Sequence, residues 1–77
     1  MDIKILGPGC RYCTMLEERT RQALDSLGAS ADIEKITDMA TIVGYGLMST
    51  PGLVVDGEVV ASGKVPSVRQ LTRLLER

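Results

Sequence analysis

Both cysteines of the chain lie in one motif, Cys10-Arg11-Tyr12-Cys13, at the start of a segment with helical periodicity. A thiol at the beginning of a helix meets unpaired backbone N–H groups and the positive end of the helix dipole, and both stabilise the thiolate. The positive charge of Arg11 acts in the same direction. Cys13 lies one turn further on, close enough to form a disulfide with Cys10. The motif therefore predicts thiol–disulfide exchange, in which Cys10 attacks a substrate disulfide and Cys13 resolves the mixed disulfide.

Two other interpretations of the cysteine pair remain open at this point. A structural zinc site takes four ligands, whereas this chain has two cysteines and no histidine. A metal ion or cluster would therefore need a second subunit to complete its ligands. An inert buried pair is the third interpretation, and a helix start beside the turn at residues 7–9 is expected to be too exposed for it. We favour redox exchange without a metal or bound cofactor, because a dithiol carries both electrons itself.

The motif is expected to lie between a strand and a long helix. Residues 3–6 are an apolar run that ends at Gly7-Pro8-Gly9, which is typical of a strand followed by a turn. The helix is predicted over residues 11–27, with Gly28 after its last turn. Its buried stripe should consist of Cys13, Leu16, Thr20, Ala23, Leu24 and Leu27. Glu17 and Arg21 are expected on the opposite face, at the favourable i,i+4 spacing.

The rest of the chain predicts a second strand, a short helix, a hairpin and a final helix. The second strand is expected at residues 31–36, and a helix capped by Thr37 or Asp38 should end near Tyr45. Asp56-Gly57 between two β-branched runs predicts a hairpin with a two-residue turn. Ser62-Gly63 then reads as a turn. The last helix should begin at Pro66-Ser67, where Ser67 and Gln70 fit a capping box, and bury Val68, Leu71 and Leu75.

The order of these elements predicts an α/β fold, β-α-β-α-β-β-α, in one domain over residues 1–77. The first β-α-β unit implies parallel strands joined by a right-handed crossover, and the hairpin adds two antiparallel strands. The expected result is a four-stranded mixed sheet with helices on both faces.

Charge and composition exclude several classes of partner. The net charge is −1 and the only aromatic residues are Tyr12 and Tyr45, so we expect no nucleic-acid binding. No apolar run is long enough to span a bilayer, and Met1 is not followed by a secretory signal. We therefore expect no membrane association and a cytoplasmic location, where a cysteine pair is more often catalytic than structural.

Several residues together resemble the thioredoxin-like superfamily. They are the C-x-x-C after the first strand, Met48-Ser49-Thr50-Pro51 before the hairpin, and Ser62-Gly63 before the last helix. Leu6-Gly7-Pro8-Gly9-Cys10 is most similar to the small redox-active disulfide proteins, also described as atypical, glutaredoxin-like thioredoxins.

The resemblance implies roles for individual residues. Cys10 is the nucleophile, Cys13 the resolving thiol, and Pro51 a cis-proline beside the disulfide. Thr50 offers backbone groups to a substrate peptide, and Gly63 keeps the approach to this groove open. Tyr12 is either a substrate-facing ring or simply an exposed helix residue, and we include it among the substrate-binding residues.

The resemblance also implies partners. We expect a monomer that reduces disulfide-containing proteins and is recycled by a flavoprotein of the thioredoxin-reductase type. The C-x-Tyr-C form is similar to glutaredoxins, so glutathione is the alternative electron donor. Thioredoxins often hold a buried acidic residue beneath the cysteines, whereas this chain has Lys4 in the corresponding region.

Overall fold

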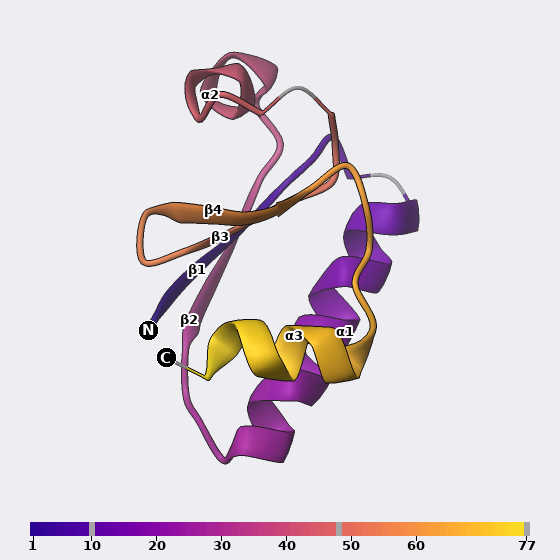
Figure 1. Cartoon of the computed structure of the whole chain (residues 1–77). Coiled ribbons are helices and arrows are strands. Elements are labelled where there is room, and N and C mark those ends of the chain that lie inside the picture. Colours follow the sequence, from indigo (N-terminus) through magenta and orange to yellow (C-terminus); the bar gives the residue numbers. More distant parts are fainter. Residues whose placement is uncertain (10, 48, 77) are drawn as a thin grey trace.

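A computed structural model describes residues 1–9, 11–47 and 49–76 of the chain, so that Cys10, Met48 and Arg77 lie outside the described residues. Its elements follow the predicted order: β1 (Asp2–Leu6), α1 (Arg11–Leu27), β2 (Asp32–Ile36), α2 (Met39–Gly44), β3 (Gly52–Val55), β4 (Glu58–Ser62) and α3 (Val68–Leu75). The sheet has four strands in the order β2-β1-β3-β4 (Figure 1). β1 and β2 run parallel, while β3 is antiparallel to both of its neighbours. The predicted fold class is therefore confirmed.

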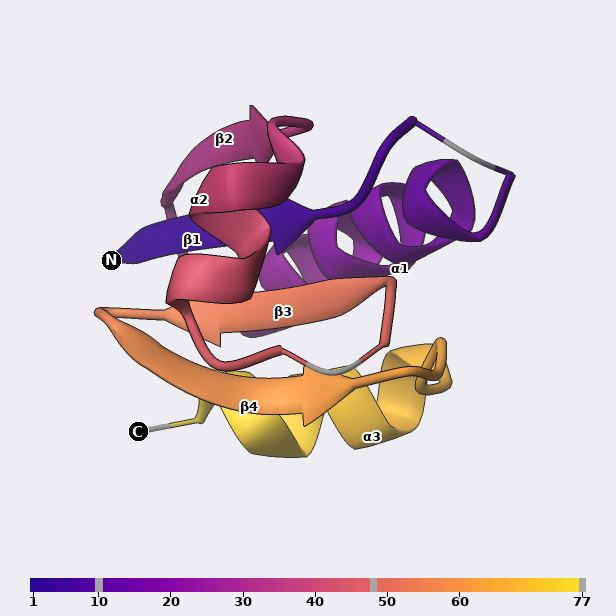
Figure 2. The same ribbon diagram turned by 90° about the horizontal axis from the view of Figure 1, so that it is seen from above.

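The two faces of the sheet are covered by different helices. Figure 2 shows α2 crossing one face, with α1 and α3 on the other. Because side chains alternate along a strand, Ile3 and Ile5 of β1 point to the face covered by α1 and α3, and Leu6 points to the face covered by α2. The larger core lies under α1 and α3, where Leu16 and Leu71 are fully buried. Each such side chain contributes about 1.5–3 kcal/mol through burial.

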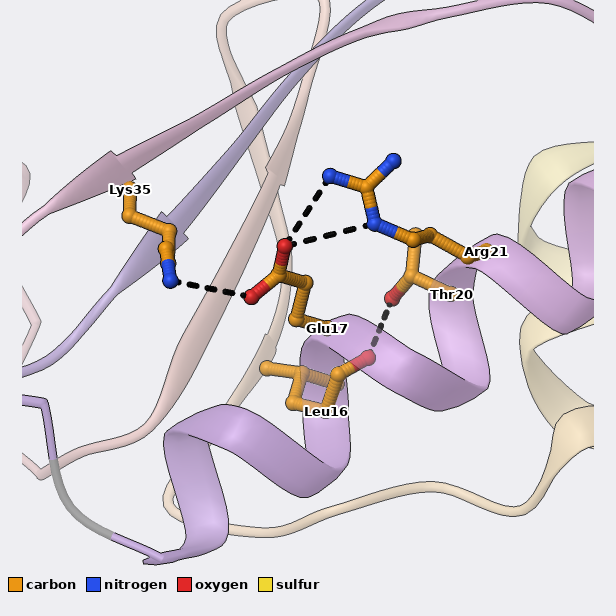
Figure 3. A network of polar contacts seen from close by, with 5 residues as sticks. All are labelled: Leu16, Glu17, Thr20, Arg21 and Lys35. Atoms are coloured by element: carbon orange, nitrogen blue, oxygen red, sulfur yellow. Dashed lines mark hydrogen bonds and ion pairs between the residues drawn. The ribbon is translucent and has the colours of Figure 1, made fainter.

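Helix α1 has the bounds and the buried stripe that its periodicity predicts. Cys13, Leu16, Thr20, Ala23 and Leu24 are buried, and Leu27 packs against the same core as a partly buried residue. The buried hydroxyl of Thr20 donates a hydrogen bond to the Leu16 carbonyl at 2.7 Å, so its burial leaves no donor unsatisfied (Figure 3).

Glu17 was expected to face solvent, but it lies at the edge of the contact between α1 and the sheet. Its side chain is only 16% exposed and binds two cations. Arg21 of the same helix lies at 3.0 Å and Lys35 of β2 at 3.2 Å (Figure 3). The pair with Lys35 joins elements distant in sequence, which the i,i+4 spacing alone does not reveal. It connects α1 to the outer strand β2, whereas the pair with Arg21 lies within α1.

The predicted turns and caps are present, with small shifts in boundaries. Asp38, rather than Thr37, caps α2, and its carboxylate accepts the Thr41 N–H at 3.0 Å. Ser67 and Gln70 form the predicted capping box of α3. Ser62, expected in a turn, is the last residue of β4. Strands β1 and β2 begin at Asp2 and Asp32, one residue from their expected starts.

The hairpin between β3 and β4 has the two-residue turn that Asp56-Gly57 predicts. Val55 lies opposite Glu58, so Asp56 and Gly57 form the whole connection between the two strands. Their φ angles are 50° and 84°, and such a positive pair is what a type I′ hairpin turn requires.

Candidate active site

Three loops meet at one end of the sheet. Leu6, the last residue of β1, lies opposite Gly52, the first residue of β3, and Gly52 lies opposite Ser62 at the end of β4. This register brings together the residues that follow β1, precede β3 and follow β4. Helix α1 begins at the same end, directly after the first of these loops (Figure 2). Residues distant in sequence therefore become neighbours here.

Cys13 is buried in the first turns of α1, against the loop that follows β1. Its exposed fraction is 4%. A Cβ atom added at Gly7 would overlap the Cys13 sulfur and would lie 4.0 Å from the Pro51 Cα. Gly7 is thus the contact point between the helix that carries Cys13 and the loop that carries Pro51. Cys10, the predicted attacking cysteine, lies outside the described residues.

Pro51 and Gly63 connect the second and third loops. The Thr50–Pro51 peptide bond is cis, as the resemblance implies. The Pro51 carbonyl accepts a hydrogen bond from the Gly63 N–H at 2.8 Å. Gly63 has φ +72°, and a Cβ atom there would overlap the Ser49 hydroxyl. Only glycine fits position 63 without strain, because the backbone is left-handed and Ser49 approaches closely.

A groove of about 420 Å³ lies between these loops and the start of α1. Its lining includes Tyr12, Thr50, Pro51 and Gly63, the four residues predicted to bind substrate. Tyr12 is 57% exposed, so its ring is accessible from solvent. The structure therefore brings these four residues to one surface, beside the buried Cys13.

Sequence analysis missed four further residues of the groove. Met15, Arg19, Lys64 and Val65 complete its lining. Tyr12, Met15 and Arg19 follow one another at helical i, i+3 and i+7 steps, next to the buried stripe. This spacing places Met15 and Arg19 on the same side of α1 as Tyr12, so they could have been predicted as neighbours of Tyr12. No comparable pattern points to Lys64 and Val65, because they reach the groove through the end of β4.

Almost the whole chain is similar to proteins of one known family. Residues 1–76 match the family model described as thioredoxin domain. The chain belongs to the thioredoxin family. It is 44% identical to a thioredoxin of Methanothermobacter thermautotrophicus over 75 residues, which cover 97% of each chain. It is 36% identical to a thioredoxin of Methanocaldococcus jannaschii over 74 residues, covering 96% of this chain and 85% of the relative. Membership of this family supports a redox protein with disulfide oxidoreductase activity.

In this thioredoxin-family chain Lys4 of β1 does not point to the face of the sheet that α1 covers. Lys4 alternates with Ile3 and Ile5, so it points to the face that α2 covers. Its ammonium group lies 3.0 Å from Asp2 and 3.5 Å from Glu34. The hydrogen bond that Lys4 donates to the Asp2 carboxylate is the main cause that raises the pKa of Lys4 above its usual value. Lys4 therefore forms its ion pairs on the opposite face of the sheet from α1, which carries Cys13.

Across residues 1–9, 11–47 and 49–76, no three His, Cys, Asp or Glu side chains gather as a set of metal ligands. Within the same ranges, none of the helices of this thioredoxin-family chain combines the length and the apolar content needed to cross a lipid bilayer.

Proposed function

We propose that the chain reduces disulfides in protein substrates through Cys10 and Cys13. The burial of Cys13 is the observation that supports this division of roles. With a 4% exposed fraction, Cys13 is out of reach of a disulfide in a folded partner. The first attack therefore has to come from Cys10, and Cys13 reacts only with a disulfide that Cys10 has already formed.

The proposed reaction balances without any further reactant. The Cys10 thiolate attacks one sulfur of the substrate disulfide and forms a mixed disulfide, and the other substrate sulfur leaves as a thiolate that takes a proton from solvent. Cys13 then loses its proton to solvent, and its thiolate attacks the Cys10 sulfur. The second substrate sulfur leaves as a thiolate and takes up a proton, and the Cys10–Cys13 disulfide forms. Two electrons pass from the dithiol to the substrate, so the proposal requires no bound cofactor.

The backbone of Thr50 is the proposed docking point for the substrate peptide. Continuing the antiparallel register beyond Leu6 and Gly52 would place Pro8 opposite Thr50, but the chain turns away after β1. In the described part of the chain, no backbone hydrogen bond uses the N–H or C=O of Thr50. An extended substrate segment can pair with these groups as an added strand. Such pairing would present the substrate disulfide beside Pro51.

Recycling requires two electrons and two protons from a partner. We propose a flavoprotein of the thioredoxin-reductase type, acting on the Cys10–Cys13 disulfide of a cytoplasmic monomer. The alternative donor is glutathione, which the C-x-Tyr-C form of the motif suggests.

The test uses two cysteine variants and a redox titration. Cys10→Ser should abolish reduction of a model protein disulfide, whereas Cys13→Ser should accumulate a mixed disulfide at Cys10 that mass spectrometry detects. Alkylation across thiol–disulfide buffers should give a two-electron transition near about −270 mV for a reductase, while a value near about −200 mV favours the glutathione-linked alternative. If Cys10→Ser is as active as the parent chain, or if no intramolecular disulfide forms, the proposal is wrong.

A further inference from the structure

The charged residues described in the groove are all cationic. Among the described residues of its lining, Arg19 and Lys64 are the only ionisable side chains apart from Tyr12, and none is acidic. Among the residues that the structure describes, neither Arg19 nor Lys64 has an ion-pair partner. The groove therefore holds two cations whose charge the described protein does not neutralise.

Arg19 is held in place by backbone rather than by an acid. One of its guanidinium nitrogens, Nη1, donates to the carbonyls of Val65 and Pro66, each at 3.3 Å. These neutral acceptors orient the side chain across the gap between α1 and the loop after β4. A guanidinium group carries five N–H donors, so the donors on Nε and Nη2 remain for an anionic ligand. The position of the cation is thus set before any ligand binds.

A second groove continues from the first. Its volume is about 400 Å³, and it shares Lys64 and Val65 with the groove beside Pro51. It lies between β4 and α3, and Arg73 is its other cation. None of the described residues that line it is acidic, as in the first groove. An extended segment bound beside Pro51 could therefore continue past Lys64 toward Arg73.

The other end of the sheet has the opposite charge. Asp2 and Asp32 lie opposite each other in the register of β1 and β2. Asp56, in the hairpin turn, accepts the Asp2 N–H at 2.9 Å and so lies beside the same pair. Of these aspartates, Asp2 is also paired with Lys4 at 3.0 Å. A negatively charged partner is attracted by Arg19 and Lys64 at the groove end rather than by this cluster of aspartates.

We propose that the groove selects disulfides flanked by acidic residues. Arg19 and Lys64 contact carboxylates of the substrate close to its disulfide, and Arg73 contacts a carboxylate further along the bound segment. This selectivity rests on the proposed reduction of protein disulfides and specifies which disulfides are reduced fastest. It acts mainly through the rate of association, which attraction between opposite charges increases and salt reduces.

The experiment compares three peptide disulfides that differ only in the residues flanking the cysteines, which are Glu, Gln or Lys. Steady-state kcat/KM is measured for each peptide with the full chain and a chemical or enzymatic reductant. At about 0.01 M salt the Glu peptide should be reduced about tenfold faster than the Lys peptide, and at about 1 M salt the ratio should approach unity.

The test variant Lys64→Gln/Arg73→Gln should lower the ratio of Glu-peptide to Lys-peptide rates at least about threefold at low salt. The control variant Lys35→Gln/Arg69→Gln removes the same amount of charge from residues that line neither groove. It should keep the parent ratio, which excludes an effect of net charge alone.

Each outcome addresses one of the two proposals. If the parent chain reduces all three peptides at similar rates at low salt, the charge selectivity is wrong and disulfide reduction stands. Equal loss of selectivity in the test and control variants also overturns the assignment to this groove. If no peptide is reduced at all, the proposed function itself fails, and the selectivity with it.

Discussion

The two ends of the sheet are built in different ways. At the far end, β3 and β4 are joined by Asp56-Gly57, two adjacent residues whose positive φ angles form the turn, and Asp56 is also hydrogen-bonded to Asp2 of β1. At the groove end, residues after β1, before β3 and after β4 contact one another across long stretches of sequence. The far end therefore depends on local conformation, whereas the groove end depends on how closely separate segments can approach.

The glycines show this difference most clearly. A Cβ atom at Gly57 would meet nothing within 4 Å, so this residue serves only the positive φ of the turn. A Cβ atom at Gly7 would overlap the Cys13 sulfur, and one at Gly63 would overlap the Ser49 hydroxyl. Glycine at the groove end is needed for space as well as for backbone conformation. Substitutions at the two ends should therefore have effects of different size.

The largest effect is expected for Gly7→Ala. The added methyl group overlaps the buried Cys13 side chain, so either the loop or α1 has to move, at a cost of about 1–3 kcal/mol. Disulfide reduction should fall with it, because Cys13 moves relative to Pro51. Urea unfolding and the rate of disulfide reduction measure both effects.

Gly44→Ala is the matched control for this substitution. Gly44 ends α2, and a Cβ atom there meets nothing within 4 Å. Alanine should be neutral or stabilise the fold by up to about 1 kcal/mol, with unchanged activity. Equal stability of the two alanine variants would show that Gly7 is not a point of close contact.

A smaller effect is expected when Gly63→Ala is compared with Gly57→Ala. Both residues have positive φ, 72° and 84°, so both variants lose about 1 kcal/mol through the backbone. Gly63→Ala should lose about 1 kcal/mol more because its methyl group also meets Ser49. The double variant Ser49→Ala/Gly63→Ala should recover part of that difference. The free energies of unfolding of the parent chain and the three variants measure these differences. Equal losses of stability for Gly57→Ala and Gly63→Ala would show that the two ends of the sheet do not differ in this way.

The smallest effect is expected for Glu17→Gln, which weakens the contact between α1 and β2 away from both ends. Hydrogen bonds from Arg21 and Lys35 hold the pKa of Glu17 below its ordinary value of 4.5, Arg21 contributing most. Because the folded-state pKa is lowered, the stabilisation is complete above the pKa of the unfolded chain and is lost as pH falls through the folded-state pKa. The variant should be about 0.5–1 kcal/mol less stable at neutral pH, and this difference should be lost as pH falls through the folded-state pKa of Glu17.

Disulfide reduction by Glu17→Gln should match that of the parent chain, since Glu17 is not part of the groove lining. Unfolding curves at neutral and acid pH measure the difference in stability, and an assay of disulfide reduction measures the activity. A stability difference that persists at low pH would mean that Glu17 acts through packing rather than through its charge.

Much of the fold was predictable because its signals are local. The stripe from Cys13 to Leu24 repeats with the helical period, the Asp56-Gly57 pair selects a hairpin turn, and Ser67 with Gln70 caps α3. The element order then restricts the topology to a parallel pair and an added hairpin. The site was predictable only in part. Thr50, Pro51 and Gly63 followed from a family resemblance and Tyr12 from its place in the cysteine motif. Arg19 was missed although it continues the helical spacing of Tyr12 and Met15, and no pattern indicated Lys64.

The sequence by itself determined which segments become helices, strands and turns, and it predicted that the cysteine motif lies at the start of a helix. These features depend on φ preferences, capping and side-chain periodicity, which act over a few residues. Only the tertiary structure decided that Gly7, Pro51 and Gly63 meet beside Cys13 and that Arg19 and Lys64 share one groove. The physical reason is the strand register: pairing Leu6 with Gly52 and Gly52 with Ser62 sets which loops become neighbours, and no local preference specifies that pairing.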